Sequence, residues 1–228
     1  MNTPRRRVLV AGATGLVGAS LVACLCEDPG VAEVHALARR DLPCAHPTLR
    51  VHRVDFAALP ALPPVDEVYL ALGTTIAVAG SQAAFRAVDF DANLAVARAA
   101  QAAGARRLGL VSAMGANTRS QVFYNRVKGE LEAALAVLGF DGLVIARPSL
   151  LRGNRTALGQ PLRAGELRWA KVDALLRPLL PRGLRAIDGS DVAAALAATV
   201  PNARGRVLLT SAMMQDAQSR AAQIRVTA

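Results

Sequence analysis

The sequence predicts an α/β fold, a doubly wound parallel sheet with helices on both faces and a short C-terminal segment on the substrate side. Three observations support this. Short apolar runs alternate with longer helical stretches. Hydrophobic residues make up 53% of the chain but aromatic residues only 4%, so the core is aliphatic, as in a parallel sheet. A glycine motif also lies between the first predicted strand and the first predicted helix.

The predicted elements follow one another as repeated strand–helix units. Short apolar runs predict strands at residues 8–11, 34–38, 49–56, 67–72, 107–112, 143–146 and 207–209. Longer stretches predict helices at 16–27, 81–103, 121–138 and 167–180, and a last Ala-rich helix capped by Ser190 or Asp191. Such alternation predicts right-handed crossovers. The 228 residues are expected to form one domain, with residues 151–190 beside the substrate.

Composition narrows the class of protein. The net charge is +10, but arginines scattered through the chain carry nearly all the positive charge, which favours a solvated surface over nucleic-acid binding. The three cysteines form no CxxC pair, and the three histidines show no metal-ligand spacing. Polar residues interrupt the longest apolar stretch, so no membrane span is expected. These features predict a cytoplasmic protein without a metal; they leave open whether it is a monomer or a dimer.

The glycine motif predicts a dinucleotide site. Gly12, Gly15 and Gly18 are spaced three residues apart between a strand and a helix. In a Rossmann-type fold the first glycine makes the tight turn, the second lets the backbone approach a pyrophosphate, and the third lets the helix pack on the sheet. Backbone N–H groups at the start of the helix then bind the phosphates. A glycine-rich turn without a ligand is the alternative interpretation.

The end of the second strand indicates which dinucleotide is bound. An acidic residue at this position accepts a hydrogen bond from the ribose 2′-hydroxyl of NAD, whereas arginine pairs with the 2′-phosphate of NADP. Here Arg39 and Arg40 follow the strand, with Asp41 next to them. The sequence therefore favours NADPH and leaves NADH possible.

A Tyr–Lys pair supplies the candidate chemistry. Tyr124 and Lys128 are four residues apart on a predicted helix and share one face. A tyrosine hydroxyl ordinarily has a pKa near 10, and a nearby ammonium favours its phenolate form, so such a pair suits proton transfer to a carbonyl oxygen. Lys128 could also donate to the nicotinamide ribose. Ser112, at the end of the fifth strand, is a candidate for holding the substrate carbonyl.

Taken together, these residues resemble the short-chain dehydrogenase/reductase superfamily, and more narrowly its atypical Tat-interacting-protein-like group and bacterial relatives. The resemblance covers roughly residues 7 to 200. It rests on the glycine spacing, residues 72–75 (LGTT), residues 111–116 (VSAMGA), the Tyr–Lys pair and Arg147-Pro148.

The resemblance implies that NADPH lies across the strand ends and that Tyr124 is the proton donor or acceptor. The phosphates would contact Thr14, Gly15, Leu16 and Val17. The 2′-phosphate would contact Arg39 and Arg40, and the adenosine ribose would contact Leu72 and Gly73. The nicotinamide would contact Pro148, Ser149 and Leu150.

One departure from the family pattern keeps alternatives open. Many relatives carry a second serine where this chain has Ala113, and that serine is often catalytic. The first hypothesis is an NADPH-dependent oxidoreductase acting on a small carbonyl or hydroxyl compound. The second is a protein that binds NADPH and a partner without turnover. The third is an NAD-dependent sugar-nucleotide epimerase or dehydratase, which the short tail and the two arginines disfavour. A nucleic-acid binder ranks last.

Overall fold

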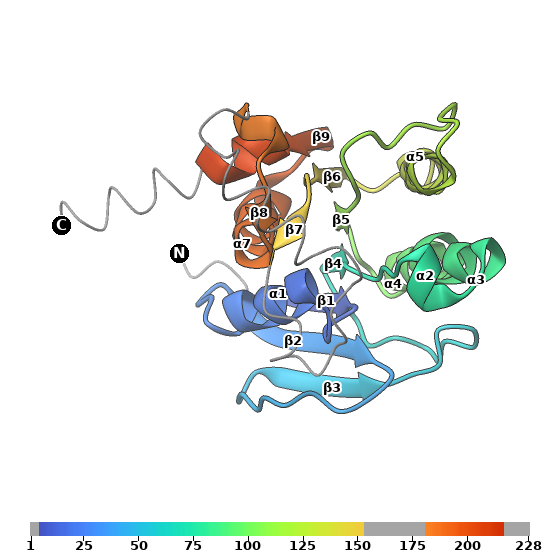
Figure 1. The fold of residues 1–228 in the computed structure, drawn as a ribbon. Coiled ribbons are helices and arrows are strands. Elements are labelled where there is room, and N and C mark those ends of the chain that lie inside the picture. Colours follow the sequence, from blue (N-terminus) through green and yellow to red (C-terminus); the bar gives the residue numbers. More distant parts are fainter. Residues whose placement is uncertain (1–4, 153–180, 217–228) are drawn as a thin grey trace.

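The computed structural model describes residues 5–152 and 181–216, and its centre is a parallel β-sheet (Figure 1). Seven strands lie in the order β3-β2-β1-β4-β5-β6-β9, and every neighbouring pair is parallel. Their bounds are β1 Arg6–Ala11, β2 Val31–Ala38, β3 Leu49–Arg53, β4 Glu67–Leu70, β5 Arg107–Val111, β6 Gly142–Arg147 and β9 Gly205–Thr210. The strand order reverses between β1 and β4, where doubly wound sheets bind their ligands.

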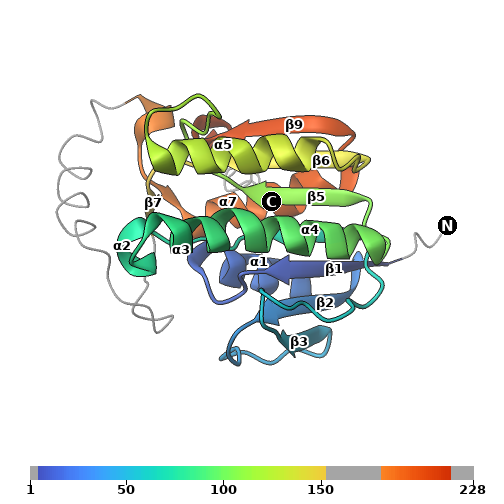
Figure 2. The same ribbon diagram turned by 90° about the vertical axis from the view of Figure 1, so that its right-hand side faces the viewer.

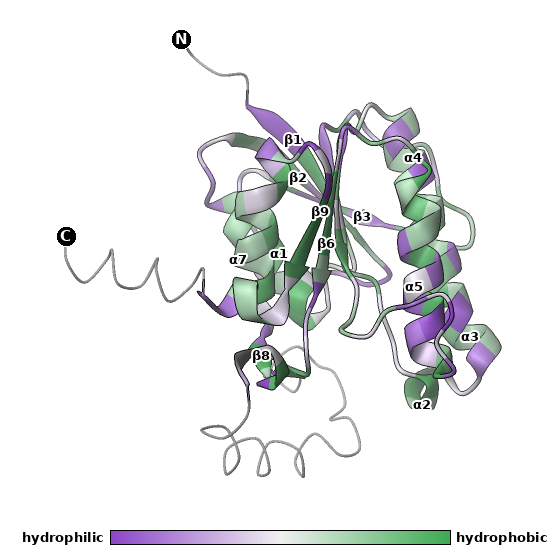
Figure 3. Cartoon of the chain, turned by 90° about the horizontal axis from the view of Figure 1, so that it is seen from above, coloured by the Kyte–Doolittle hydropathy of each residue, from purple (hydrophilic) through white to green (hydrophobic). Residues whose placement is uncertain are grey.

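Helices cover both faces of this sheet (Figures 2 and 3). On one face lie α1 (Leu16–Cys26) and α7 (Gly189–Thr199), which contact each other, and on the other lie α4 (Asn93–Ala102) and α5 (Phe123–Ala136). Shorter elements are α2 (Ile76–Ala79), α3 (Gln82–Arg86), the π-helix η1 (Ala87–Ala92), the 3-10 helices η3 (Arg182–Leu184) and η4 (Val200–Asn202), and the small sheet of β7 (Leu151–Arg152) and β8 (Ile187–Asp188). None of the described helices has the length and apolarity to cross a membrane.

The core has two halves because successive side chains of a strand point to opposite faces. Val8 and Val10 of β1 pack toward α1 and α7, whereas Leu9 packs toward α4 and α5. All three are fully buried. The part of a strand that is buried on both faces must be apolar, which is why residues 8–11 of β1 form a continuous aliphatic run.

The predicted α/β fold is confirmed, with different element ends. The strand expected at 34–38 begins earlier, at Val31, and the strand expected at 49–56 ends at Arg53. The last helix begins at Gly189 after the N-cap residue Asp188, so the cap predicted at Ser190 or Asp191 is wrong. The helix predicted at 167–180 and most of the segment 151–190 lie outside the described residues.

The helix predicted at 81–103 is present but irregular. It begins after Ser81, whose side chain accepts a hydrogen bond from the backbone N–H of Ala84. Residues 87–92 then form a π-helical segment before α4 continues. An extra residue in a helical turn changes which side chains face inward, and such segments often occur at functional sites. The alanine-rich composition of this helix did not reveal the irregularity.

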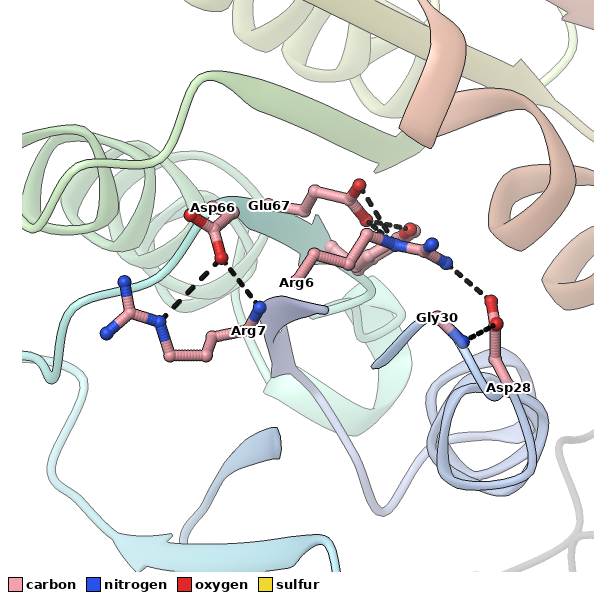
Figure 4. A network of polar contacts seen from close by, with 7 residues as sticks. Arg6, Arg7, Asp28, Gly30, Asp66 and Glu67 are labelled. Atoms are coloured by element: carbon pink, nitrogen blue, oxygen red, sulfur yellow. Dashed lines mark hydrogen bonds and ion pairs between the residues drawn. The ribbon is translucent and has the colours of Figure 1, made fainter. Parts of the chain in front are cut away.

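Figure 4 shows a polar network at the amino-terminal edge of the sheet, opposite the edge where the glycine motif lies. The carboxylate of Glu67 accepts hydrogen bonds from Arg6 Nε at 3.2 Å and from Tyr69 Oη at 2.8 Å. Arg6 also pairs with Asp28, in the α1–β2 connection. Glu67 is 1% exposed, and this burial raises its pKa. The network therefore joins β1, β4 and the α1–β2 connection.

The raised pKa of Glu67 predicts a pH-dependent stability. Folding favours the protonated carboxyl of Glu67. The contribution of this group to the free energy of unfolding is therefore fully present below the ordinary glutamate pKa and is lost as pH rises through the folded-state pKa. Glu67→Gln removes the titration, so the free energy of unfolding of this variant should increase relative to that of wild type as pH rises from about 4 to about 6. Urea unfolding at several pH values measures this. The control is Asp91→Asn, at an exposed position. Parallel pH profiles of the free energy of unfolding for wild type and Glu67→Gln would contradict the prediction.

Candidate functional site

The turn between β1 and α1 has the geometry of a dinucleotide-binding loop. Gly12 has a φ of +87°, and a Cβ there would lie 2.5 Å from the backbone carbonyl of Ala71. A Cβ at Gly18 would lie 2.0 Å from the carbonyl oxygen of Gly12. Side chains are therefore excluded at both positions, and α1 begins directly against the turn.

The first turn of α1 can receive an anion. The first N–H groups of a helix have no acceptor within the helix. The N-cap residue Gly15 provides no side-chain cap, and no acidic residue lies in the first turn. Thr14 and Leu16 are half-buried beside this end, whereas the Val17 side chain is buried in the core, so only its backbone can contact a ligand. The predicted phosphate-contacting residues therefore lie together, in a cradle that fits a pyrophosphate.

A second helix supports this turn from the far part of the chain. Gly189, the first residue of α7, packs so closely on α1 that a Cβ there would lie 3.1 Å from the backbone carbonyl of Leu16. Gly189 is not among the residues predicted to form the site. Its only signal was a glycine at the start of an Ala-rich helix, which by itself indicates no partner.

The predicted 2′-phosphate ligands lie next to the glycine loop. Arg39 and Arg40 directly follow β2 and are exposed. Ala11 is paired with Leu37 in the sheet, so the end of β2 lies beside Gly12. Asp41 is also exposed at this corner.

The segment after β4 approaches the Tyr–Lys helix. The carbonyl oxygen of Leu72 accepts a hydrogen bond from Asn93 Nδ2 at 3.2 Å. A Cβ at Gly73 would lie 3.9 Å from Lys128 Nζ and 3.5 Å from Asp89 Oδ1. The loop predicted to border the adenosine ribose is therefore in reach of the predicted catalytic lysine.

Tyr124 and Lys128 lie one turn apart on α5, as the spacing predicts. The Tyr124 ring packs against the buried Phe85, with ring centroids 5.5 Å apart. The Lys128 side chain is 5% exposed, and its Nζ lies 2.7 Å from Asp89 Oδ1. Among the described residues, no hydrogen bond to the Tyr124 hydroxyl is found. The helix thus presents a phenol and a buried ion pair near the strand ends.

Ser112 is engaged by a side chain that lies two turns after Tyr124 on α5. Its hydroxyl donates to Glu132 Oε1 at 2.6 Å, and both residues are buried. Glu132 lies eight residues after Tyr124 on α5, about 12 Å along the helix axis. Arg147 forms two hydrogen bonds to the same carboxylate, at 2.9 and 2.6 Å, and these raise the pKa of its guanidinium. The geometry therefore supports a structural role for Ser112 rather than the predicted substrate contact.

Pro148, Ser149 and Leu150 follow β6 at the same edge of the sheet. The carbonyl oxygen of Pro148 accepts a hydrogen bond from the Met114 N–H at 2.9 Å, and the Ser149 hydroxyl lies 2.9 Å from that of Ser211. Leu150 is 46% exposed. Of the three, Leu150 therefore offers the most surface to a ligand.

A comparison with family models decides the family. The model of a family described as NAD(P)H-binding matches residues 12–141, more than half of the chain. The chain belongs to this NAD(P)H-binding family. The match begins at the first glycine of the motif and includes α5 with the Tyr–Lys pair. The predicted nicotinamide dinucleotide is thereby supported as a cofactor class.

Curated relatives and solved structures agree with this assignment. The chain is 37% identical over 162 residues to "Protein FMP52, mitochondrial" of Coccidioides immitis, covering 64% of this chain and 66% of that protein. It is 31% identical over 207 residues to the protein of the same name from Emericella nidulans, covering 80% and 89%. The fold is similar to that of MoeE5 in complex with UDP-glucose and NAD, with a TM-score of 0.66 and 21% identity, covering 89% of this chain and 75% of that one.

The relatives correct one expectation. Both curated proteins are named as mitochondrial, which contradicts the cytoplasmic location expected from the sequence. That expectation rested on free cysteines and the lack of an apolar span. Such features argue against an oxidising compartment, but they do not distinguish among the remaining ones.

Proposed function

We propose that the protein is an NADPH-dependent oxidoreductase of the short-chain dehydrogenase type, acting on a small carbonyl or hydroxyl compound. The observation that carries the proposal is the meeting of two motifs. The glycine loop and the Tyr–Lys helix lie at the same edge of the sheet, and Gly73 brings the β4 loop close to Lys128. The finer resemblance to the Tat-interacting-protein-like group belongs to the same proposal.

Each part of the site has a task in this proposal. The glycine loop and the N–H groups of α1 hold the diphosphate, and Arg39 and Arg40 pair with the 2′-phosphate. Leu72 and Gly73 border the adenosine ribose, and residues 148–150 flank the nicotinamide. Lys128 donates to the ribose hydroxyls and favours the phenolate of Tyr124, which exchanges a proton with the substrate oxygen. When bound, the nicotinamide exchanges a hydride with the substrate carbon.

The cofactor preference is tested by titrating the protein with NADPH and with NADH. Charge-assisted hydrogen bonds contribute about 1.5–3 kcal/mol each, so NADPH should bind at least about tenfold more tightly. Arg39→Ala/Arg40→Ala should remove this preference and leave NADH affinity nearly unchanged, since NADH has no 2′-phosphate. Arg204→Ala, an exposed arginine just before β9 at the opposite edge of the sheet, is the charge-matched control. An equal affinity of the wild type for both nucleotides would exclude the proposed roles of Arg39 and Arg40.

A second function has its own supporting observation. The Ser112 hydroxyl is engaged by Glu132, and Ala113 has no hydroxyl, so a serine that orients a carbonyl is missing at this strand end. A protein that binds NADPH and changes its affinity for a partner, without turnover, needs no such serine. NADPH binding without turnover of any carbonyl compound, together with a partner interaction that responds to NADPH, would favour this function.

A further inference from the structure

In the π-helical segment η1, one aspartate of a close pair faces inward. Asp89 is fully buried, whereas Asp91, two residues later, is exposed. A buried carboxylate is costly unless it is paired and hydrogen-bonded. The contacts of Asp89 therefore indicate why the chain retains it.

Asp89 joins three segments that border the candidate site. Its Oδ1 lies 2.7 Å from Lys128 Nζ on α5. Its Oδ2 accepts a hydrogen bond of 2.8 Å from the backbone N–H of Thr74, in the loop after β4. Asn93, one turn later, is also fully buried and donates to the carbonyl oxygen of Leu72 in that loop at 3.2 Å. The loop and the lysine are thus held by neighbouring turns of one helix.

Other charged groups near Lys128 have partners of their own. Glu132, one turn later on α5, pairs with Arg147 at 2.6 Å and with Arg206 at 3.3 Å. Glu130 pairs with Arg86 of α3 on the outer side of the helix. Tyr124, one turn earlier, is the remaining titratable group on this face of α5. The ammonium of Lys128 is therefore in contact with Asp89, while these neighbouring carboxylates are engaged elsewhere.

Burial and charge act in opposite directions on Lys128. A side chain that is 5% exposed loses most of its hydration, which disfavours the ammonium. A carboxylate at hydrogen-bond distance offsets this loss and restricts the direction of Nζ. A lysine that is to donate to ribose hydroxyls and to act on a phenol needs both a charge and a fixed position.

We propose that Asp89 is a positioning residue of the site: it keeps Lys128 charged and directed, and it ties the lysine to the loop after β4 that borders the dinucleotide. The inference rests on the proposed function, because the tasks of Lys128 come from it.

The charge of Lys128 can be followed directly, since the chain contains only two lysines, Lys128 and Lys171. Biosynthetic ¹³Cε-lysine labelling then gives two NMR signals, and Lys171→Arg assigns them. Asp89→Asn keeps an acceptor for the Thr74 N–H but removes the charge. The titration midpoint of Lys128 should fall by about 1–3 pH units. Asp91→Asn, an equal change of charge at an exposed position of η1, should leave it unchanged.

An unchanged Lys128 midpoint in Asp89→Asn would overturn the proposal. If that variant does not fold, the titration midpoint of Lys128 in the wild-type protein tests the proposal. The proposal requires that Lys128 be charged at neutral pH, whereas a fully buried lysine without a partner can titrate at about 5–6. A wild-type midpoint below about 7 would also overturn the proposal.

A double-mutant cycle tests whether Asp89 acts through Lys128. Asp89→Asn should raise the Kd for NADPH about tenfold, and Lys128→Met should raise it by at least as much. In the Lys128→Met background, Asp89→Asn should have no further effect. An equal loss in both backgrounds would show that Asp89 acts on the loop alone, which would contradict the positioning role.

The inference and the proposed function fail in different measurements. The lysine titration is carried out without nucleotide, so it reports the ion pair whether or not NADPH binds. Absence of NADPH binding by the wild-type protein would remove the proposed cofactor while the response of Lys128 to Asp89→Asn remained.

Discussion

Tyr124→Phe is expected to lower turnover by on the order of 10²–10⁴-fold, since it removes the hydroxyl that exchanges a proton with the substrate oxygen. The ring remains, so packing against Phe85 and the position of α5 should be preserved. The affinity for NADPH should change little, because the phenol is not among the groups proposed to hold the nucleotide. NADPH consumption with a panel of aldehydes and ketones measures the effect.

Tyr69→Phe is a matched control for this variant, because the chain contains only these two tyrosines. Tyr69 is fully buried and donates to Glu67 at the opposite edge of the sheet. Loss of the Tyr69 hydroxyl should reduce the free energy of unfolding by about 1–3 kcal/mol, because Glu67 loses a buried hydrogen-bond donor. Turnover should be retained. If Tyr124→Phe turned over as rapidly as wild type, the catalytic role of Tyr124 would be excluded.

Gly18→Ala is expected to weaken NADPH binding by about 100-fold or more. The new Cβ would lie 2.0 Å from the carbonyl oxygen of Gly12, so α1 must move away from the turn whose N–H groups hold the diphosphate. Overpacking of this kind also costs about 1–3 kcal/mol of stability. Isothermal titration calorimetry and thermal unfolding measure the two effects separately.

Gly183→Ala provides the comparison. A Cβ at Gly183 would meet no atom of the described residues within 4 Å, so neither affinity nor stability should change appreciably. Retention of wild-type affinity by Gly18→Ala would mean that the turn does not hold the nucleotide, and the proposed cofactor site would then be wrong.

Much of the fold was predictable because its signals are local. The part of a parallel strand that is buried on both faces must be apolar, and residues 8–11 of β1 are. The glycine spacing reflects steric limits within one turn, since Gly12 and Gly18 approach each other closely. The Tyr124–Lys128 pair follows from helical periodicity alone. Each of these features depends on residues that are near one another in the chain.

For Ser112, local sequence patterns were not sufficient to predict the hydrogen-bond partner. Its place at the end of β5 was correctly predicted, but the partner of its hydroxyl was not. That partner, Glu132, is 20 residues away and is shared with Arg147 of β6. Which hydroxyl faces a ligand depends on the side chains that compete for it, and packing brings those together.

Local sequence patterns were sufficient to predict the class of fold, the glycine turn, the arginines after β2 and the helix that carries Tyr124 and Lys128, because periodicity and steric limits act over a few residues. Packing of distant segments pairs Asp89 with Lys128 across 39 residues of chain, from a π-helical turn that no local pattern indicated. Packing likewise places Gly189 against the start of α1. Contacts between distant segments depend on how the helices pack on the sheet, and burial then selects which charges must be paired.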